Sequence, residues 1–155
     1  MISRIVSGGQ SGVDRAGLDA ALACGVPIGG WCPRGRRAED GPIPDHYPMI
    51  ETEAEDYGVR TKWNVRDSDA TLILATEPLN GGTSMTAGFA DDLGRPHMIV
   101  DPASVVGPRE AARWIARENI AVLNIAGPRE SKQPGIYKSA LAFVTELIEI
   151  DRARQ

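Results

Sequence analysis

Short apolar runs alternate with amphipathic segments along most of the chain. Runs with the length and composition of buried strands lie at residues 2–7, 26–31, 70–75, 96–100 and 121–126, with a shorter one at 49–51. Segments with a helical spacing of apolar positions lie at residues 12–24, 54–67, 83–93, 108–118 and 136–150. Alternating strands and helices favour a mainly parallel sheet with helices on both faces, so the pattern predicts one α/β domain over residues 1–155.

Glycines and small polar residues indicate where several of these helices begin and end. Gly25 and Gly94 follow the first and third helices and are typical of helix C-termini. Thr83 or Ser84 is expected to cap the third helix at its N-terminus. Residues 32–48 are rich in Pro, Gly and Arg and are too long for a simple connection, which favours a functional loop.

Four unusual loops follow predicted strands. They span residues 8–14, 31–44, 76–86 and 127–137. In open parallel sheets, ligands bind beyond the carboxyl ends of the strands, where such loops gather. Their shared position therefore predicts one binding site at this edge of the sheet.

The first of these loops has the composition of an anion-binding turn. Gly8, Gly9 and Gly12 allow backbone angles that side chains disfavour and let a ligand approach the main chain. Gln10 and Ser11 add side-chain donors, and the start of the following helix attracts anions. The loop matches neither the dinucleotide pattern G-x-G-x-x-G nor a P-loop, and a tight turn without a ligand is the alternative.

Two later loops carry groups that suit an oxyanion. The third helix opens with Gly81, Gly82 and Thr83. Its first backbone N–H groups would form a second anion site, although simple capping explains the same residues. The last strand is followed by Arg129, Ser131 and Lys132. They place a planar guanidinium and two further donors within four positions, which favours anion binding over a merely solvated loop.

The long second loop holds a cluster of arginines. Arg34, Arg36 and Arg37 stand beside Glu39 and Asp40. The acids could neutralise the arginines in a surface network. In a chain that is acidic overall, a local basic cluster more often faces an anion.

Composition narrows the class of protein. The 155 residues carry a net charge of −4 and are 42% hydrophobic and 25% charged, as in ordinary globular domains. The acidic balance argues against a nucleic-acid partner or an anionic membrane surface. No apolar run reaches the length of a membrane span, no signal peptide is visible, and the two cysteines form no disulfide framework. We therefore expect a cytoplasmic protein.

No residue pattern in the chain indicates catalysis or a metal centre. No nucleophile–base pair is evident in the sequence, and no Cys and His residues have the spacing of metal ligands. The sequence therefore predicts neither catalytic residues nor a protein-bound metal.

Five segments together resemble a known family. They are Val6–Arg15, Gly29–Gly41, Thr61–Asp69, Gly81–Thr83 and Ala126–Tyr137. These segments are similar to those of the proteins proposed as molybdenum cofactor carriers, and the resemblance covers nearly the whole chain. That family belongs to a wider Rossmann-like group, which also contains the lysine-decarboxylase-like phosphoribohydrolases.

The resemblance implies a non-catalytic carrier that binds, protects and delivers the molybdenum cofactor. It also implies a homo-oligomer, a dimer or a tetramer, whose exchange partners would be molybdoenzymes or cofactor-biosynthesis proteins. The cofactor is a reduced pterin with a dithiolene that holds oxo-molybdenum, and it ends in a phosphate. The glycine-rich, Arg34–Arg37, Gly81–Thr83 and Arg129–Lys132 loops could supply donors to both ends.

The chain departs from the phosphoribohydrolases at the third helix. Those enzymes place a catalytic glutamate shortly after their Gly-Thr motif, whereas here the first carboxylate after Thr83 is Asp91. A general acid or base would then have to be another carboxylate, and the candidates are Asp14, Glu39, Asp40 and Asp69. A hydrolase of nucleoside phosphates and a nucleotide-sensing module remain the alternatives to the carrier.

Overall fold

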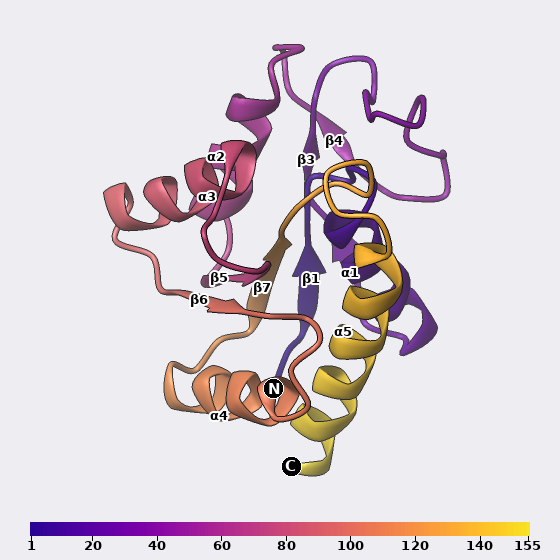
Figure 1. Ribbon diagram of the computed structural model, residues 1–155. Coiled ribbons are helices and arrows are strands. Elements are labelled where there is room, and N and C mark those ends of the chain that lie inside the picture. Colours follow the sequence, from indigo (N-terminus) through magenta and orange to yellow (C-terminus); the bar gives the residue numbers. More distant parts are fainter.

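The computed structural model describes all residues from 1 to 155 and places five parallel strands in one central sheet. Their order is β2-β1-β7-β5-β6, and they span Ile28–Gly29, Arg4–Val6, Val122–Ala126, Ala70–Leu74 and His97–Val100. A separate parallel pair is formed by β3 (Trp31–Cys32) and β4 (Ile50–Glu51). The chain passes from β1 to the edge strand β2 and from β5 to the opposite edge strand β6. The β7 strand lies between β1 and β5, so the connections on its two sides run in opposite directions (Figure 1).

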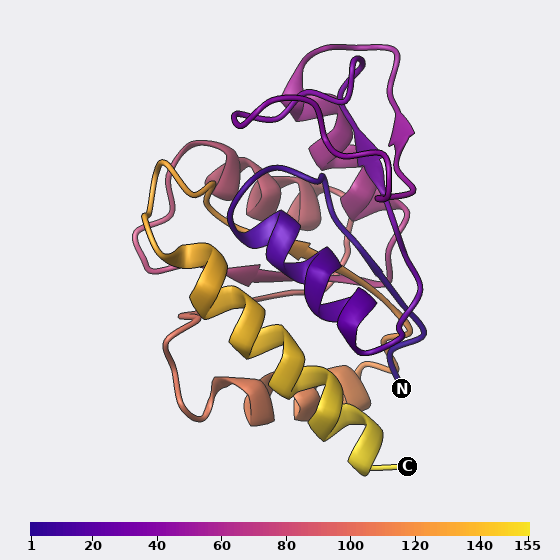
Figure 2. The ribbon, with the colours of Figure 1, turned by 90° about the vertical axis from the view of Figure 1, so that its right-hand side faces the viewer.

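Helices cover both faces of the sheet, as the sequence predicts. They are α1 (Val13–Ala23), α2 (Tyr57–Arg66), α3 (Gly81–Asp92), α4 (Gly107–Arg117) and α5 (Ile136–Ala153). The α1, α4 and α5 helices pack together on one face, and α2 and α3 pair on the other (Figure 2). The fold is therefore a Rossmann-like three-layer sandwich.

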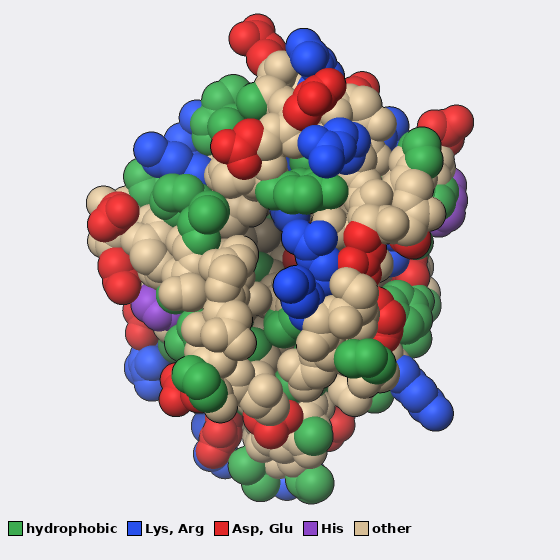
Figure 3. All heavy atoms as spheres, turned by 45° about the horizontal axis from the view of Figure 1, so that its top comes forward, with side chains coloured by type: hydrophobic (Ala, Val, Ile, Leu, Met, Phe, Trp, Pro, Cys, Tyr) green, Lys and Arg blue, Asp and Glu red, His purple; other side chains and the backbone are tan.

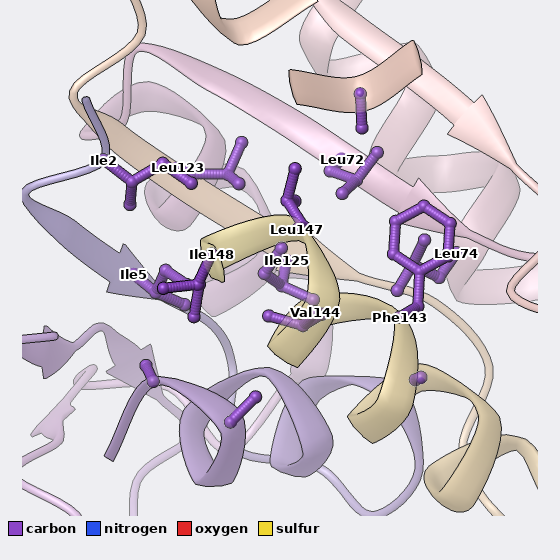
Figure 4. Close-up of a cluster of buried hydrophobic side chains, with 14 of the residues drawn as sticks. Ile2, Ile5, Leu72, Leu74, Leu123, Ile125, Phe143, Val144, Leu147 and Ile148 are labelled. Atoms are coloured by element: carbon purple, nitrogen blue, oxygen red, sulfur yellow. The ribbon is translucent and has the colours of Figure 1, made fainter. Parts of the chain in front are cut away.

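The main core lies between the sheet and the α1, α4 and α5 helices. Side chains of alternate positions on the strands, such as Leu72, Leu74, Leu123 and Ile125, meet the apolar stripe of α5 (Figure 4). Gly17 lets α1 approach β7 closely, because a Cβ there would lie 2.9 Å from Ile125. This packing fixes the start of α1 relative to the end of β7, where the binding site is expected.

One predicted strand was wrong in its extent. The run at residues 26–31 does not form a single strand, because Gly30 interrupts it with a φ of 129°. A side chain at Gly30 would collide with the carbonyl of Ser7. The chain therefore turns out of the central sheet after β2, and β3 pairs with β4 instead.

Two helix starts also differ from prediction. The α2 helix begins three residues later than expected, because the Asp56 side chain caps it by accepting the N–H of Gly58 at 2.8 Å. The α3 helix begins two residues earlier, at Gly81. Asn80 occupies its N-cap position and no side chain caps it, so the expected cap by Thr83 or Ser84 was wrong.

The long loop after β3 is fastened to the body of the protein. Asp19 of α1 accepts hydrogen bonds from the hydroxyls of Tyr47 in the loop and Tyr137 in α5, each at 2.5 Å. Burial and the nearby Asp19 carboxylate raise the pKa of Tyr137 to about 12 and raise that of Tyr47 further. Ile43 and Tyr47 also join Leu18 and Cys32 in a second apolar cluster. The loop is thus an ordered part of the fold.

None of the helices combines the length and the apolar character that crossing a bilayer requires.

Candidate functional site

A cavity of about 830 Å³ opens at the carboxyl ends of β5 and β7. Its volume falls within the range of sites that enclose a small organic ligand. The wall is formed by the loops that follow β1, β5 and β7, together with the sides of α2 and α3. Figure 3 shows Lys and Arg side chains around the hollow on this face of the molecule. The cavity therefore lies at the sheet edge where the sequence predicts a binding site.

Seven of the fourteen predicted binding residues line the cavity. They are Gly8, Gln10, Gly81, Gly82, Thr83, Arg129 and Lys132. The other seven lie outside its lining: Gly9, Ser11, Gly12, Arg34, Arg36, Arg37 and Ser131.

Most of the N–H groups in the first glycine-rich loop are used inside the protein. The Gly9 N–H donates to Ser7 Oγ at 3.3 Å and the Ser11 N–H donates to Gln10 Oε1 at 3.0 Å. The Val13 N–H donates to the carbonyl of Pro128 at 3.2 Å. A side chain at Gly12 would collide with that carbonyl. The Val13–Pro128 bond joins the end of the loop after β1 to the loop after β7, and both loops contribute to one wall of the cavity.

A buried ion pair closes the base of this wall. Arg60 Nη1 of α2 lies 2.8 Å from Asp14 Oδ2 in the first turn of α1. Gly8 is required beside it, because a Cβ at that position would overlap the Arg60 guanidinium. Burial raises the pKa of Asp14 above its ordinary value even though Arg60 opposes the shift.

Two donors next to this ion pair have no acceptor. Gln10 Nε2 and Arg60 Nε are buried and make no hydrogen bond within the protein. The Gln10 residue is 5% exposed, and both residues belong to the cavity wall. An unpaired buried donor costs about 1–3 kcal/mol. Two such donors at one cavity favour a ligand rich in acceptor atoms.

The N-terminus of α3 faces the same cavity. The N–H groups of Gly81 and Gly82 make no hydrogen bond in the protein, while those of Thr83 and Ser84 donate to the Asn80 carbonyl. A Cβ at Gly81 or Gly82 would meet no atom within 4 Å, so the backbone is open to an approaching group. Free N–H groups and the helix dipole together attract anions.

Glu39 of the long loop holds two of the site loops together. Its carboxylate accepts hydrogen bonds from the Ser11 hydroxyl and from the hydroxyl and N–H of Ser131, the last at 3.1 Å. Its own N–H donates to Gln10 Oε1 at 2.8 Å. Burial alone would raise the pKa of Glu39, but these hydrogen bonds and Arg129 lower it below its ordinary value. Ser11 and Ser131 therefore act in loop assembly.

The three arginines of the long loop bond to other residues of the protein and lie outside the cavity lining. Arg36 donates to the carbonyls of Ile43, Pro44 and Tyr47 at 2.8–3.0 Å and so shapes its own loop. Arg34 forms an exposed ion pair with Glu55 at 3.4 Å. Arg37 Nη1 donates to the carbonyl of Glu55 at 3.1 Å, so Glu55 contacts two of the three arginines.

Tyr57, at the first position of α2, gathers three cations around a ring that lines the cavity. The guanidinium carbons of Arg37, Arg60 and Arg129 lie 5.2, 5.5 and 5.5 Å from the ring centroid. Such contacts between a cation and a ring are favourable and draw like charges together. Positive charge is therefore gathered beside the cavity in a protein of negative net charge.

Sequence reasoning missed several residues of the cavity wall. Arg60 and Tyr57 were treated only as parts of a helix, because a basic or aromatic residue on an exposed helix face carries no distinctive signal. Asn64 and Asn124 could have been found. Both are polar residues in segments whose neighbours are apolar, and both are buried, at 3% exposure.

Comparison with known proteins places the chain in a family. Residues 5–148 match the family described as "Circularly permutated YpsA SLOG family". The chain belongs to this family. No curated protein matches the chain at a significant level.

A solved structure resembles this family member closely. It is the crystal structure of a protein from Syntrophus aciditrophicus, described as a proposed molybdenum carrier protein. The two share 42% sequence identity, with 97% of this chain and 94% of the other covered, and the TM-score is 0.86. In the structure of the present chain, no three His, Cys, Asp or Glu residues are grouped so that they could hold a metal ion.

Proposed function

We propose that the protein binds the molybdenum cofactor in the cavity at the carboxyl ends of β5 and β7. In this proposal it protects the cofactor and delivers it without transforming it. The observation that carries the proposal is the pair of unpartnered buried donors, Gln10 Nε2 and Arg60 Nε, at the wall of a basic cavity. The likeness to a protein described as a molybdenum carrier supports the choice of ligand.

The donor set of the cavity fits such a ligand. The phosphate and the oxo groups on molybdenum accept hydrogen bonds, and Arg129, Lys132 and the open N-terminus of α3 supply donors and positive charge. The volume of about 830 Å³ is large enough for a ligand with a fused ring. The dithiolene brings the ligands for molybdenum, so the protein would hold the metal through the cofactor.

The test is anaerobic gel filtration of the purified protein mixed with molybdenum cofactor released from a molybdoenzyme. The protein peak is then oxidised and its pterin fluorescence is measured. About one pterin per chain would support the proposal. A protein peak without pterin, while a known carrier retains it in parallel, would overturn it.

The proposal includes exchange partners and a homo-oligomer, a dimer or a tetramer, as the resemblance of the sequence implies. Light scattering on the eluted peak measures the mass against the 16.6 kDa of one chain. A mass of two or four chains would support the dimer or the tetramer, and a mass of one chain would rule out both.

Asp14 favours a second candidate, a hydrolase of nucleoside phosphates. Among the four carboxylates that sequence reasoning names, it alone lines the cavity. The other three carboxylates have partners elsewhere in the protein. Glu39 accepts hydrogen bonds from two serines, and Asp40 forms an ion pair with Arg15 at 3.1 Å. Asp69 accepts the Val122 N–H at 2.7 Å. Burial raises the pKa of Asp14, which suits a group that gives up a proton in catalysis.

Release of free base from nucleoside monophosphates tests this candidate. Activity in the wild-type protein that disappears in the Asp14→Asn variant would establish it. No release by the wild-type protein, or the same rate in both proteins, would remove Asp14 as the catalytic group. Competition between a nucleotide and the cofactor for binding separates a nucleotide-sensing module from the carrier.

A further inference from the structure

The wall that β7 gives to the cavity is polar at a position where a buried strand is ordinarily apolar. Asn124 is the one polar residue of β7, and it is 3% exposed. It pairs in register with Val6 of β1 and with Thr71 of β5. Its neighbour Leu123 packs into the main core on the other face of the sheet. Asn124 therefore lies on the face that borders the cavity, which it lines.

The hydrogen-bonding capacity of Asn124 is only partly used. Its Nδ2 donates to Thr71 Oγ1 at 3.2 Å, and its Oδ1 accepts no hydrogen bond within the protein. Asn64, the other buried asparagine of the wall, differs in this respect. Its Oδ1 accepts the Trp31 N–H at 2.8 Å and its Nδ2 donates to the Trp31 carbonyl at 2.9 Å. Asn64 thus joins α2 to β3, whereas no bond in the fold accounts for the Asn124 oxygen.

The amide oxygen of Asn124 is free to accept a hydrogen bond from a group in the cavity. The oxygen still opens to the cavity, so a ligand that displaces water from it without donating a hydrogen bond would lose binding free energy. The oxygen also carries a partial negative charge, so it attracts N–H groups and disfavours phosphate or oxo oxygens. The surface of β7 therefore favours hydrogen-bond donors of a ligand, whereas Arg129 and Lys132 favour its acceptors.

We propose that Asn124 recognises the N–H edge of the ring system in the bound ligand, and that Thr71 positions its amide. This inference rests on the proposed function. A pterin carries amino and lactam N–H groups, whereas its phosphate and the oxo groups on molybdenum offer only acceptors. The ring then lies against β7, and the anionic ends lie toward Arg129, Lys132 and the start of α3.

The test measures the anaerobic dissociation constant for the molybdenum cofactor in four proteins at several salt concentrations. They are the wild type and the variants Asn124→Leu, Thr71→Val and Arg129→Ala. Losing one neutral hydrogen bond should weaken the binding of Asn124→Leu by about five- to tenfold, with the same salt dependence as the wild type. Thr71→Val should weaken it by about threefold, again with unchanged salt dependence. Arg129→Ala should weaken binding and also reduce its salt dependence, because it removes a charge.

Each outcome decides the inference. Binding by Asn124→Leu within about twofold of the wild type overturns the recognition of the ring and leaves the proposed function intact. Loss of both affinity and salt dependence in Asn124→Leu also overturns it, because Asn124 would then act by supporting the cationic wall. If the wild type does not bind the cofactor, the proposed function fails and the inference fails with it. If Asn124→Leu does not fold, the conservative Thr71→Val variant decides the question through its dissociation constant and the salt dependence of that constant.

Discussion

Arg60 Nη1 lies 2.8 Å from Asp14 Oδ2 at the base of the cavity, and their side chains are only 12% and 6% exposed. The pair joins α2 to the first turn of α1, so it connects helices on opposite faces of the sheet. Each charged group is tolerated in its buried place because the other balances it. The remaining positive charge of the wall comes from Arg129 and Lys132, which the proposed function assigns to the anionic ends of the ligand.

Stability should respond to pH through Asp14. Burial raises its pKa above the ordinary 3.8, so the folded protein binds a proton at Asp14 more readily than the unfolded chain does. The resulting stabilisation is present below pH 3.8 and is lost as the pH rises through the folded pKa. We expect the free energy of unfolding of the wild type to fall relative to that of Asp14→Asn as the pH rises above 3.8. Urea denaturation of both proteins at a series of pH values measures this difference, and a difference that stays constant as the pH rises would contradict the assignment.

Glu39 should show the opposite dependence on pH. Its pKa is lowered below the ordinary 4.5, so its stabilising effect is present above that pH and is lost as the pH falls through the folded pKa. Glu39→Gln should lower the free energy of unfolding by about 1–2 kcal/mol near neutral pH, because one of the serine hydrogen bonds loses its acceptor. The deficit should shrink below pH 4.5, where protonated Glu39 resembles the Gln variant. A deficit that grows under acid conditions would show that the carboxylate does not hold the loops.

Arg129 should matter for ligand binding far more than an arginine elsewhere. Arg129→Ala is expected to weaken retention of the molybdenum cofactor by about tenfold or more, since a hydrogen bond from a charged group contributes ~1.5–3 kcal/mol. Arg109 on α4 is exposed and lies outside the cavity lining, so Arg109→Ala is the matched control for the same loss of charge. Anaerobic titration compares the two variants. Equal losses in both would remove the loop after β7 from the site.

The tyrosines that fasten the long loop can be followed by titration. Burial and Asp19 raise the pKa of Tyr137 to about 12. Asp19→Asn removes the negative charge and should move this pKa toward the ordinary value of 10.0. Ultraviolet titration of tyrosinate, with Tyr137→Phe to assign the signal, measures the shift. An unchanged titration curve in Asp19→Asn would show that Asp19 does not control these hydroxyls.

The elements of the fold could be predicted wherever the apolar pattern alone decides them. The buried run of β5 and the stripe of α5 lead directly to one strand and one helix, because each packs against the main core. The pattern fails at Gly30, where a turn forced by the neighbouring Ser7 carbonyl interrupts an apolar run. It also fails at α3, which begins two residues before Thr83 and has no side-chain cap although Thr83 and Ser84 are common capping residues.

The candidate site could be predicted as an edge of the sheet but not as a set of residues. Loops that follow parallel strands must gather at one edge, so Gly81 and Arg129 fall within the lining as expected. Arg36 was chosen for its charge alone, and in the fold its donors are used by carbonyls of its own loop. Arg60 was missed because its place in the site depends on how α2 packs, which no local pattern reveals.

The most direct test of the central claim is a crystal structure of the protein grown anaerobically with molybdenum cofactor, with molybdenum located by its anomalous scattering. We expect one peak for each chain within the cavity lined by Arg60, Arg129 and the start of α3, with density for a ring against Asn124. A peak elsewhere on the protein, or an ordered cavity without ligand in crystals of protein that retains the cofactor in solution, would contradict the account.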